Sequence, residues 1–309
     1  MTNFKNNIFV LIIVVLIFAI VSMGEKKNAE VSKKPKIAVS TFALYDITKN
    51  IVGDKADIVM ILPFGVDAHS YEPTPKQTAQ IYSSDLVVYS GAGLEPWCKN
   101  FVFKNKVIDM SKFVKLISLD KSTHHDHHHK HSDHTADPHY WLDINNMLIA
   151  TDVIYKAVVE LLPQYTKYFE ENKNHYKTML VKLDEEYKSA LDSCKKDTIV
   201  VNHNAYSYLA KNYGFHVESL AGFSPQAQAN AKNMVKILKD IKLHDIDTVF
   251  YESFASDKYI KSVAKEAGVN VKSLQPLGNI TAAEAKNKLS YKDIMKQNLE
   301  KISDAMGCR

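Results

Sequence analysis

The chain has 309 residues, of which 46% are hydrophobic and 24% charged, and its formal net charge is +4 at pH 7 with histidine neutral. These values are typical of a soluble globular protein, and they argue against a disordered chain and against a multi-span membrane protein. Lysines and acidic residues are mixed along the chain without a basic stripe, which argues against nucleic acid as a partner. The length favours two lobes over a single core.

The first 24 residues have the composition of an export signal. Lys5 precedes an uncharged apolar run over residues 8–21, and small residues stand at positions 22 and 24. The run is shorter than the roughly 20 residues that span a bilayer, which favours a cleaved signal, although an uncleaved signal that tethers the chain stays open. No cysteine follows the run, so an acylated start is not indicated. We expect a protein of the periplasm or the extracellular space.

The rest of the chain alternates predicted strands and helices in two groups. In the first group, strands are expected at residues 36–41, 56–62, 86–90 and 106–109, with helices at 42–52 and 75–82. In the second group, strands are expected at 197–201, 215–220, 248–251 and 270–274, with helices at 206–213, 228–244, 257–267 and 291–302. This alternation favours two α/β lobes, each a mostly parallel sheet flanked by helices.

A long helical segment separates the two groups. Residues 145–194 contain no glycine and one proline, Pro163, and apolar residues recur at three- and four-residue steps. We predict two helices that meet at Pro163, the second over residues 165–193 and about 40 Å long. Ligands of such folds bind in the cleft between lobes. The predicted organisation is a signal peptide at 1–24, a first lobe at 25–160, a spine helix that joins the lobes at 161–194, and a second lobe at 195–309.

The chain has three cysteines, Cys98, Cys194 and Cys308. No CxxC pair occurs among them, which excludes a zinc knuckle. In an oxidising compartment one disulfide could form and leave one thiol over. The sequence does not show which pair forms, or whether all three stay unpaired.

The thirteen histidines fall into two populations, and the first is a cluster. Seven of the eleven residues from 124 to 134 are histidine, without any apolar residue. We expect a mobile loop over residues 121–136 whose neutral imidazoles collect Zn²⁺, Cu²⁺ or Ni²⁺ with low selectivity. A polar linker that binds no metal is the alternative. The candidate accessory ligands are His124, His125, His127, His128, His129, His131 and His134.

Three histidines of the second population stand where loops enter the expected cleft. His69 follows the second predicted strand, His139 precedes the first of the two central helices, and His203 follows the first strand of the second lobe. Any one of them alone is more often a surface or core histidine than a ligand, but three imidazoles together suit zinc. The remaining histidines are given no role: His175, His216 and His244.

Several ordered motifs carry a resemblance to a known family. HSYEPTP (69–75), DPHYWLD (137–143) and HNAY (203–206) flank the histidine-rich insertion, and GAGLEPW, YESFASDK and YKDIMKQNL accompany them. From about residue 36 to residue 302, the chain resembles the substrate-binding proteins of zinc and manganese ABC transporters, most closely the zinc branch. The resemblance implies two α/β lobes joined by one long helix, and a metal in the interlobe cleft that is delivered to a permease powered by an ATPase.

Carried over residue by residue, the resemblance implies metal ligands at His69 and His139 in the first lobe and His203 in the second. Ala68 stands where the family usually has proline, which loosens the loop but leaves the imidazole. Manganese-binding relatives place an aspartate ligand in the region that matches residues 273–278, and often a glutamate at the position of His203. This chain has neither, and three imidazoles with an open or water-filled fourth position favour zinc.

Glu252 is a further candidate, either as a fourth ligand or partner of a ligand, or as a cap of the following helix. The expected function is capture of Zn²⁺ for import by a monomeric binding protein that is not an enzyme. The alternatives are a manganese-binding homologue, an adhesin or metal buffer without a transporter, and a secreted zinc hydrolase. Against the hydrolase, the sequence has no HExxH, no nucleophile elbow and no obvious general base beside a ligand.

Overall fold

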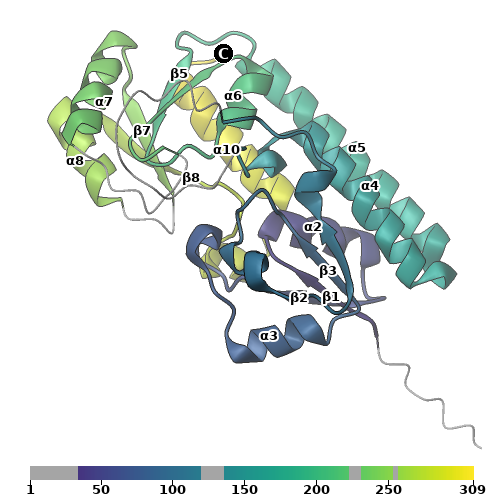
Figure 1. The fold of residues 1–309 in the computed structure, drawn as a ribbon. Helices are drawn as coiled ribbons and strands as arrows, with labels where there is room; N and C mark the ends of the chain where they lie inside the picture. Colours follow the sequence, from purple (N-terminus) through teal and green to yellow (C-terminus); the bar gives the residue numbers. More distant parts are fainter. Residues whose placement is uncertain (1–33, 120–135, 223–230, 253–256) are drawn as a thin grey trace, which may run out of the picture. The chain divides into compact units, whose positions relative to one another are not determined.

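The fold consists of two parallel sheets covered by helices and a long helix that contacts both halves (Figure 1). The computed structural model describes residues 34–119, 136–222, 231–252 and 257–309, and the chain from Pro35 to Arg309 forms one compact unit. The predicted signal peptide and the seven histidines of the predicted loop lie outside the described residues. Within the described ranges, no helix is both long and apolar enough to cross a bilayer.

The first sheet has the strand order β2-β1-β3-β4, and all neighbouring strands are parallel. Its central strands are continuous apolar runs, as expected where both faces of a parallel sheet are covered. The predicted helices at 42–52 and 75–82 and the strand at 106–109 are confirmed with the same bounds. The elements of this lobe are β1 (Lys36–Val39), α2 (Phe42–Val52), β2 (Asp57–Met60), α3 (Pro75–Tyr82), β3 (Leu86–Tyr89) and β4 (Lys106–Asp109).

The second sheet repeats this arrangement with the order β6-β5-β7-β8, again all parallel. The prediction of two α/β lobes with mostly parallel sheets is therefore confirmed. The elements of this lobe are β5 (Thr198–Val201), α6 (Ser207–Tyr213), β6 (His216–Ser219), α7 (Ala231–Leu243), β7 (Thr248–Glu252), α8 (Lys258–Ala267), β8 (Asn270–Leu274), α9 (Ala282–Lys286) and α10 (Tyr291–Met306).

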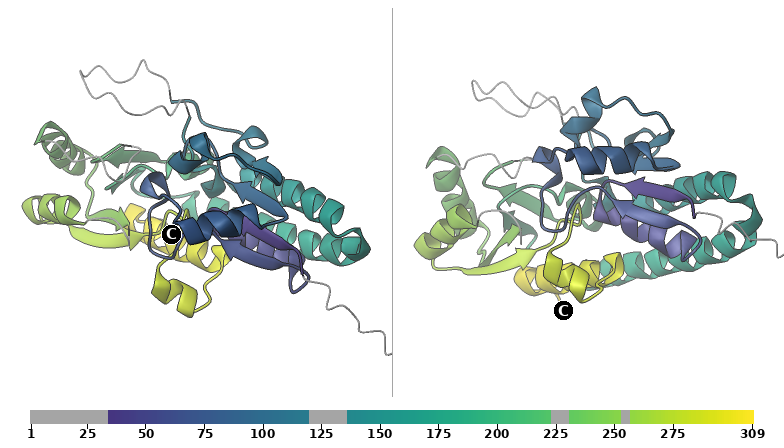
Figure 2. Two further views of the ribbon diagram at one scale, coloured as in Figure 1. Left: turned by 60° about the horizontal axis from the view of Figure 1, so that its bottom comes forward. Right: turned by 90° about the horizontal axis from the view of Figure 1, so that it is seen from below.

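Two long helices connect the lobes and lie side by side in every view (Figures 1 and 2). α4 (Ile144–Leu161) ends before a 3-10 turn at Pro163–Tyr165, and α5 (Thr166–Leu191) runs back along it. The chain reverses there because proline has no N–H to continue a helix and fits the first position of the next turn. The predicted break at Pro163 is confirmed. Further 3-10 turns lie at Ala68–Ser70, Pro96–Asn100, Met110–Lys112 and Tyr140–Leu142.

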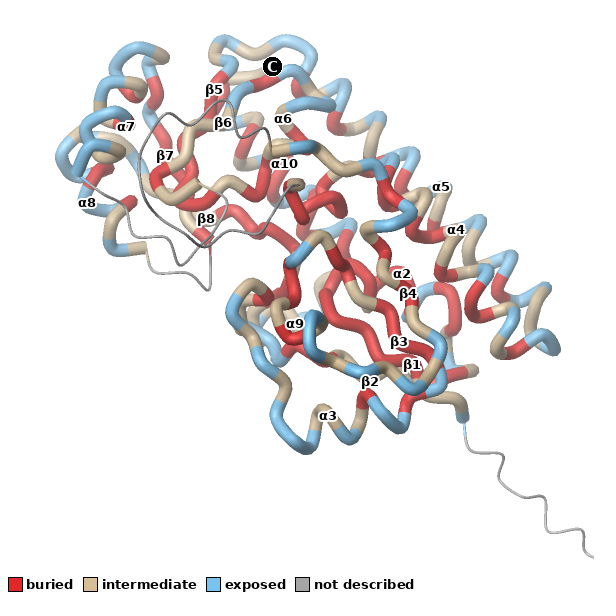
Figure 3. Tube along the Cα trace, viewed as in Figure 1, coloured by how far each residue is buried: buried red, intermediate tan, exposed pale blue. Residues whose placement is uncertain are grey.

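α5 contacts both lobes through one buried face (Figure 3). The hydroxyl of Tyr176 donates to Asp46 of α2, and the hydroxyl of Tyr187 donates to the backbone oxygen of Met295 in α10. The buried residues recur at helical spacing, so one side of the helix packs while the other faces water. They are Phe169, Tyr176, Leu180, Leu183, Tyr187 and Leu191.

Two features of the second lobe differ from the sequence-based expectation. α10 continues four residues beyond the predicted end at residue 302, because Ala305 and Met306 are still buried, and it stops at Gly307 with a left-handed backbone. The five-residue helix α9 was not predicted, since one turn is too short to show a hydrophobic period. Its start is fixed by a capping box between Thr281 and Glu284.

The structure shows which cysteines pair, and the two that do so follow the ends of two helices. Cys194 lies just after α5 and forms a disulfide with Cys308, which lies just after α10. Cys98 is a free thiol. The disulfide therefore links the end of the long helix to the end of the chain.

Candidate metal centre

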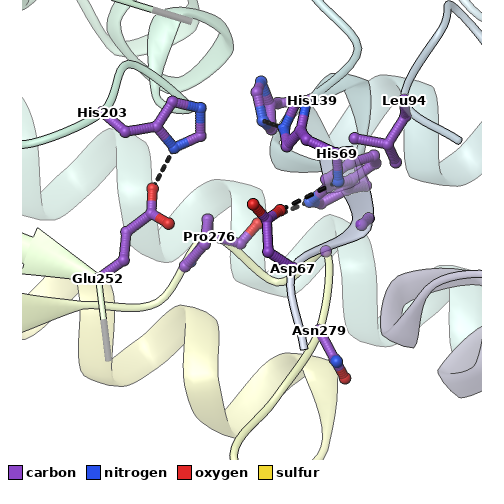
Figure 4. A pocket seen from close by; sticks show the side chains of 11 residues that line it. Asp67, His69, Leu94, His139, His203, Glu252, Pro276 and Asn279 are labelled. Atoms are coloured by element: carbon purple, nitrogen blue, oxygen red, sulfur yellow. Dashed lines mark hydrogen bonds and ion pairs between the residues drawn. The ribbon is translucent and has the colours of Figure 1, made fainter. Parts of the chain in front are cut away.

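The three histidines from different parts of the chain converge on one point (Figure 4). His69 lies in the 3-10 turn after β2, His139 lies just before the turn Tyr140–Leu142, and His203 follows β5. One ring nitrogen of each lies within 4.8 Å of the others, and the Nε2 atoms of His69 and His139 are 3.2 Å apart. Among the described residues, this is the one such group of metal-binding side chains.

The spacing of these nitrogens suits a tetrahedral ion. Zinc–nitrogen bonds of about 2.0–2.1 Å place two ligands of a tetrahedron about 3.3 Å apart. The 3.2 Å between the Nε2 atoms of His69 and His139 matches this edge. The ring centre of His203 lies 5.6 Å from that of His69 and 4.9 Å from that of His139, so the third imidazole lies beside the other two.

Two of the imidazoles are oriented by carboxylates. Asp137 is fully buried, and its Oδ1 accepts hydrogen bonds from the backbone nitrogen of His139 at 2.9 Å and from its Nδ1 at 2.7 Å. Glu252 accepts a short hydrogen bond from Nδ1 of His203. A neutral imidazole that donates from Nδ1 presents a bare lone pair at Nε2, which is the atom that binds a metal. Both rings are therefore held in the metal-binding tautomer.

A third carboxylate belongs to the loop of His69. Oδ1 of Asp67 accepts from the backbone nitrogen of His69 at 3.0 Å, and Figure 4 shows its side chain between His69 and Glu252. Asp67 and Asp137 thus share one local pattern, in which an aspartate accepts from the histidine two residues later. The spacing Asp-x-His at 67–69 and 137–139 is visible in the sequence, and it is the signal that the sequence-based prediction overlooked.

Burial and charge move the pKa values of these groups in different directions. Burial lowers the pKa of His139, although Asp137 opposes the shift. Burial also acts to lower the pKa of His203, but the Glu252 carboxylate outweighs it and the pKa of His203 is raised. Burial, with help from the charge of Glu252, raises the pKa of Asp67 to about 6. The site therefore holds more negative charge than isolated histidines would, and a cation would neutralise it.

The cavity at the centre has a volume of about 20 Å³. This is enough for a single ion or one water molecule. Ionisable side chains and apolar or uncharged residues line it together. Besides the histidines, Asp67 and Glu252, the lining consists of Ala68, Leu94, Trp141, Pro276, Gly278 and Asn279.

The three histidines that were given no role lie outside this site. His175 lies on α5, His216 on β6, and His244 just after α7, and none belongs to the cluster. Glu252 does not cap the next helix, because α8 begins after Asp257. Three carboxylates accompany the histidines, but Asp137 and Glu252 bond to ring nitrogens and Asp67 to a backbone nitrogen.

Comparison with known proteins agrees with this geometry. Residues 37–305 match the family model of the periplasmic zinc-uptake complex component A. The chain is 32% identical over 312 residues to the high-affinity zinc uptake system protein ZnuA of Bacillus subtilis, covering 97% of each chain. It is 29% identical over 314 residues to the zinc-binding protein AdcA of Streptococcus pyogenes, covering 96% of this chain but 61% of that relative.

Solved structures show the same fold. The zinc-bound AdcA of Streptococcus pneumoniae superimposes with a TM-score of 0.75 at 27% identity, covering 88% of this chain and 58% of that one. This chain therefore spans about three fifths of the length of the AdcA proteins and nearly all of the Bacillus protein. The chain belongs to the family of the zinc-uptake complex component A, the solute-binding components of zinc transport systems.

Proposed function

We propose that this protein captures Zn²⁺ outside the cytoplasmic membrane and delivers it to the permease of an ABC transporter, with His69, His139 and His203 as its ligands. The observation that supports this most directly is the convergence of three imidazole nitrogens within 4.8 Å. The names of the relatives, which refer to zinc uptake and zinc binding, support the same cargo. Zinc is the substrate of transport here, bound and then released.

The ligand chemistry favours zinc over manganese. Imidazole suits zinc, whereas manganese prefers carboxylate, carbonyl and water oxygens. The two carboxylates that accept from Nδ1 face the outer side of the rings, and they raise the basicity of the ligands without occupying the centre. Glu252 is proposed as such a partner of His203. The fourth position is then left to a water molecule.

The size of the cavity favours a binding protein over an enzyme. The cavity of about 20 Å³ matches an ion or one water molecule in size better than it matches an organic substrate. The nearby carboxylates alone do not make an active site, because a zinc hydrolase must also bind its substrate. We therefore propose a carrier that is not an enzyme.

The remaining parts of the proposal concern the whole chain. Residues 1–24 would direct export to the periplasm or the cell exterior, and the histidines between residues 124 and 134 would collect zinc at higher concentration. A monomer with lobes at 25–160 and 195–309, joined through 161–194, would hand the ion to a permease driven by an ATPase. Both lobes contribute ligands, so the permease would have to loosen the site to release the ion.

The test is zinc affinity measured by competition with a chromogenic chelator. His69→Ala, His139→Ala and His203→Ala should each weaken zinc binding by more than the roughly 10- to 100-fold that loss of an outer partner costs. His175→Ala is the matched control, because His175 is exposed on α5 and should leave the affinity unchanged. If a variant with all three ligand histidines replaced by alanine still binds one zinc as tightly as the unmodified protein, the ligand assignment is refuted.

A further inference from the structure

Residues 275–280 form a crossing segment that leaves the second sheet after β8 and packs against the first lobe. The backbone oxygen of Gly278 accepts from the backbone nitrogen of Phe42 in α2 at 3.0 Å. The backbone oxygen of Pro276 accepts from Nε1 of Trp141 at 2.7 Å. Leu277 adopts a left-handed backbone with φ of 61° and is fully buried. A non-glycine residue in that conformation is held by its surroundings, so the path of the segment is strongly determined.

Asn279 of the crossing segment holds the loop that carries His69. Its side chain is 1% exposed, and its Nδ2 donates to the backbone oxygens of Pro63 at 2.6 Å and Val66 at 2.8 Å. The backbone oxygen of the next residue, Ile280, accepts from the nitrogen of Gly65 at 2.8 Å. Three hydrogen bonds from the second lobe therefore fix residues 63–66, which lead directly into Asp67 and His69.

The loop itself has one turn hydrogen bond, which the backbone nitrogen of Val66 donates to the backbone oxygen of Pro63 at 3.2 Å. Gly65 has a positive φ of 77° and no atoms within 4 Å of the position where a Cβ would stand, and Phe64 is 46% exposed. A glycine in open space loses much conformational freedom when it is ordered, so the bonds from Asn279 and Ile280 add to this single turn bond in fixing the loop. The two bonds from Asn279 lie on either side of this glycine. Together they hold the loop on both sides of Gly65.

We infer that Asn279 is a positioning residue for zinc: the second lobe sets the place of His69, a ligand that belongs to the first lobe. This inference rests on the proposed function. His139 and His203 are oriented by Asp137 and Glu252, whereas the backbone under His69 is oriented across the cleft. Any movement that withdraws the crossing segment would displace His69 from the other two ligands, so lobe docking and zinc affinity are coupled.

The experiment compares zinc affinities in a double-mutant cycle. Asn279→Ala should weaken zinc binding about 10- to 100-fold, the range for groups that orient a ligand. Asn146→Ala is the matched control: Asn146 is also fully buried and makes two hydrogen bonds, both to the backbone of Lys115 and away from the cavity. It should change zinc affinity less than about 3-fold while removing a comparable number of buried hydrogen bonds.

The decisive arm repeats Asn279→Ala in the His69→Ala background. With no imidazole left to position, the same change should then cost less than about 3-fold. Equal losses in both backgrounds, or an affinity of Asn279→Ala within about 3-fold of the unmodified protein, would overturn the inference. Where Asn279→Ala loses the native circular dichroism spectrum, Asn279→Ser takes its place, since the hydroxyl keeps one donor and should show the same dependence on His69.

The cycle also separates this inference from the proposed function. The His69→Ala variant alone reports on the ligand assignment, because an unchanged zinc affinity in that variant would refute the proposed site. A strong effect of His69→Ala with no effect of Asn279→Ala would leave the proposed function intact and refute the positioning role.

Discussion

The charge around the three histidines distinguishes this site from a set of isolated imidazoles. Asp137 and Glu252 accept from the outer ring nitrogens of His139 and His203, and Asp67 accepts from the backbone of His69. The ring contacts of Asp137 and Glu252 fix the tautomers of His139 and His203 and strengthen both as ligands, whereas Asp67 holds the backbone of His69. The pKa of Asp67 is raised by burial and that of His203 by the nearby carboxylates, so the metal-free site retains protons that zinc must displace.

The first prediction at this scale concerns Glu252. Glu252→Gln keeps an oxygen that can accept from Nδ1 of His203 but removes the negative charge, so zinc affinity should fall by about tenfold. The pKa of His203, which Glu252 raises, should fall as well, and an NMR titration of the metal-free protein would report it. Glu218→Gln on β6 is the control, because Glu218 pairs with Lys236 and with no histidine. Unchanged zinc affinity in Glu252→Gln would contradict the role assigned to this carboxylate.

The second prediction concerns the pH dependence of zinc binding. Because the pKa of His203 is raised, its proton competes with zinc from a higher pH than an ordinary imidazole proton would. Zinc affinity should therefore begin to fall as the pH drops through the raised pKa of His203, by tenfold per unit for one proton. The fall should steepen at lower pH, where His139, whose pKa burial lowers, also protonates. Chelator competition between pH 5 and pH 8 measures this slope, and a flat profile would exclude imidazole ligands.

The sequence singled out the three histidines and Glu252 that the structure brings together, but not Asp67, Asp137 or Asn279. Three histidines could be selected because imidazole is a common zinc ligand and because the flanking motifs resemble a known family. Asp137 escaped notice because a carboxylate beside a proline reads equally well as a turn residue. Asn279 could not be found at all, since its hydrogen-bond partners lie more than 200 residues away in the chain.

Among the helices, Asp46 joins three elements at one point. It lies on α2, is 7% exposed, and accepts from the hydroxyl of Tyr176 in α5 at 2.8 Å and from the backbone nitrogen of Tyr291 in α10 at 3.3 Å. Burial raises the pKa of Asp46 to about 6, with a further contribution from Asp293 and against the two hydrogen bonds. Because folding raises the pKa of this carboxyl group, its protonation stabilises the folded state relative to the unfolded chain.

The third prediction follows from the sign of this shift. Between about pH 4 and pH 6 the folded protein binds the Asp46 proton more tightly than the unfolded chain, so this contribution to the free energy of unfolding is lost as the pH rises. In Asp46→Asn, which carries no charge, the amide oxygen can accept from the nitrogen of Tyr291 and the amide nitrogen can donate to the Tyr176 hydroxyl. It should be more stable than the unmodified protein at pH 7.5, by up to about 3 kcal/mol, and the difference should shrink toward pH 4.5.

Urea unfolding at the two pH values measures the difference. Asp152→Asn is a suitable control, because Asp152 is partly exposed and forms a surface ion pair with Lys177. If the free energies of unfolding of Asp46→Asn and the unmodified protein differ by the same amount at pH 4.5 and pH 7.5, the raised pKa of Asp46 is contradicted.

At the element scale, the strands and long helices were predictable because their signals are local. Buried parallel strands appear as unbroken apolar runs, and Pro163 marks the turn between α4 and α5. The disulfide was not predictable, because its partners Cys194 and Cys308 are brought together only by the packing of α5 against α10. The path of the crossing segment escaped prediction for the same reason.

Across the whole molecule, contacts between the lobes set the geometry of the site. α5 packs against α2 and α10, the disulfide links the ends of α5 and α10, and the crossing segment reaches from β8 to α2 and to the His69 loop. Because these contacts already hold the two lobes together, we expect only small movements when the proposed site binds an ion. Zinc binding should accordingly be dominated by ligand chemistry.

Zinc and manganese titrations in parallel, by calorimetry on the purified protein, test the central claim most directly. The account predicts one tight zinc site at about nanomolar Kd, or about −12 kcal/mol, with weak manganese binding. Additional weak zinc binding should disappear when residues 124–134 are deleted, and the tight site should persist. Tight manganese binding with weak zinc binding would leave the fold and the family in place and contradict the assignment of zinc to the three histidines.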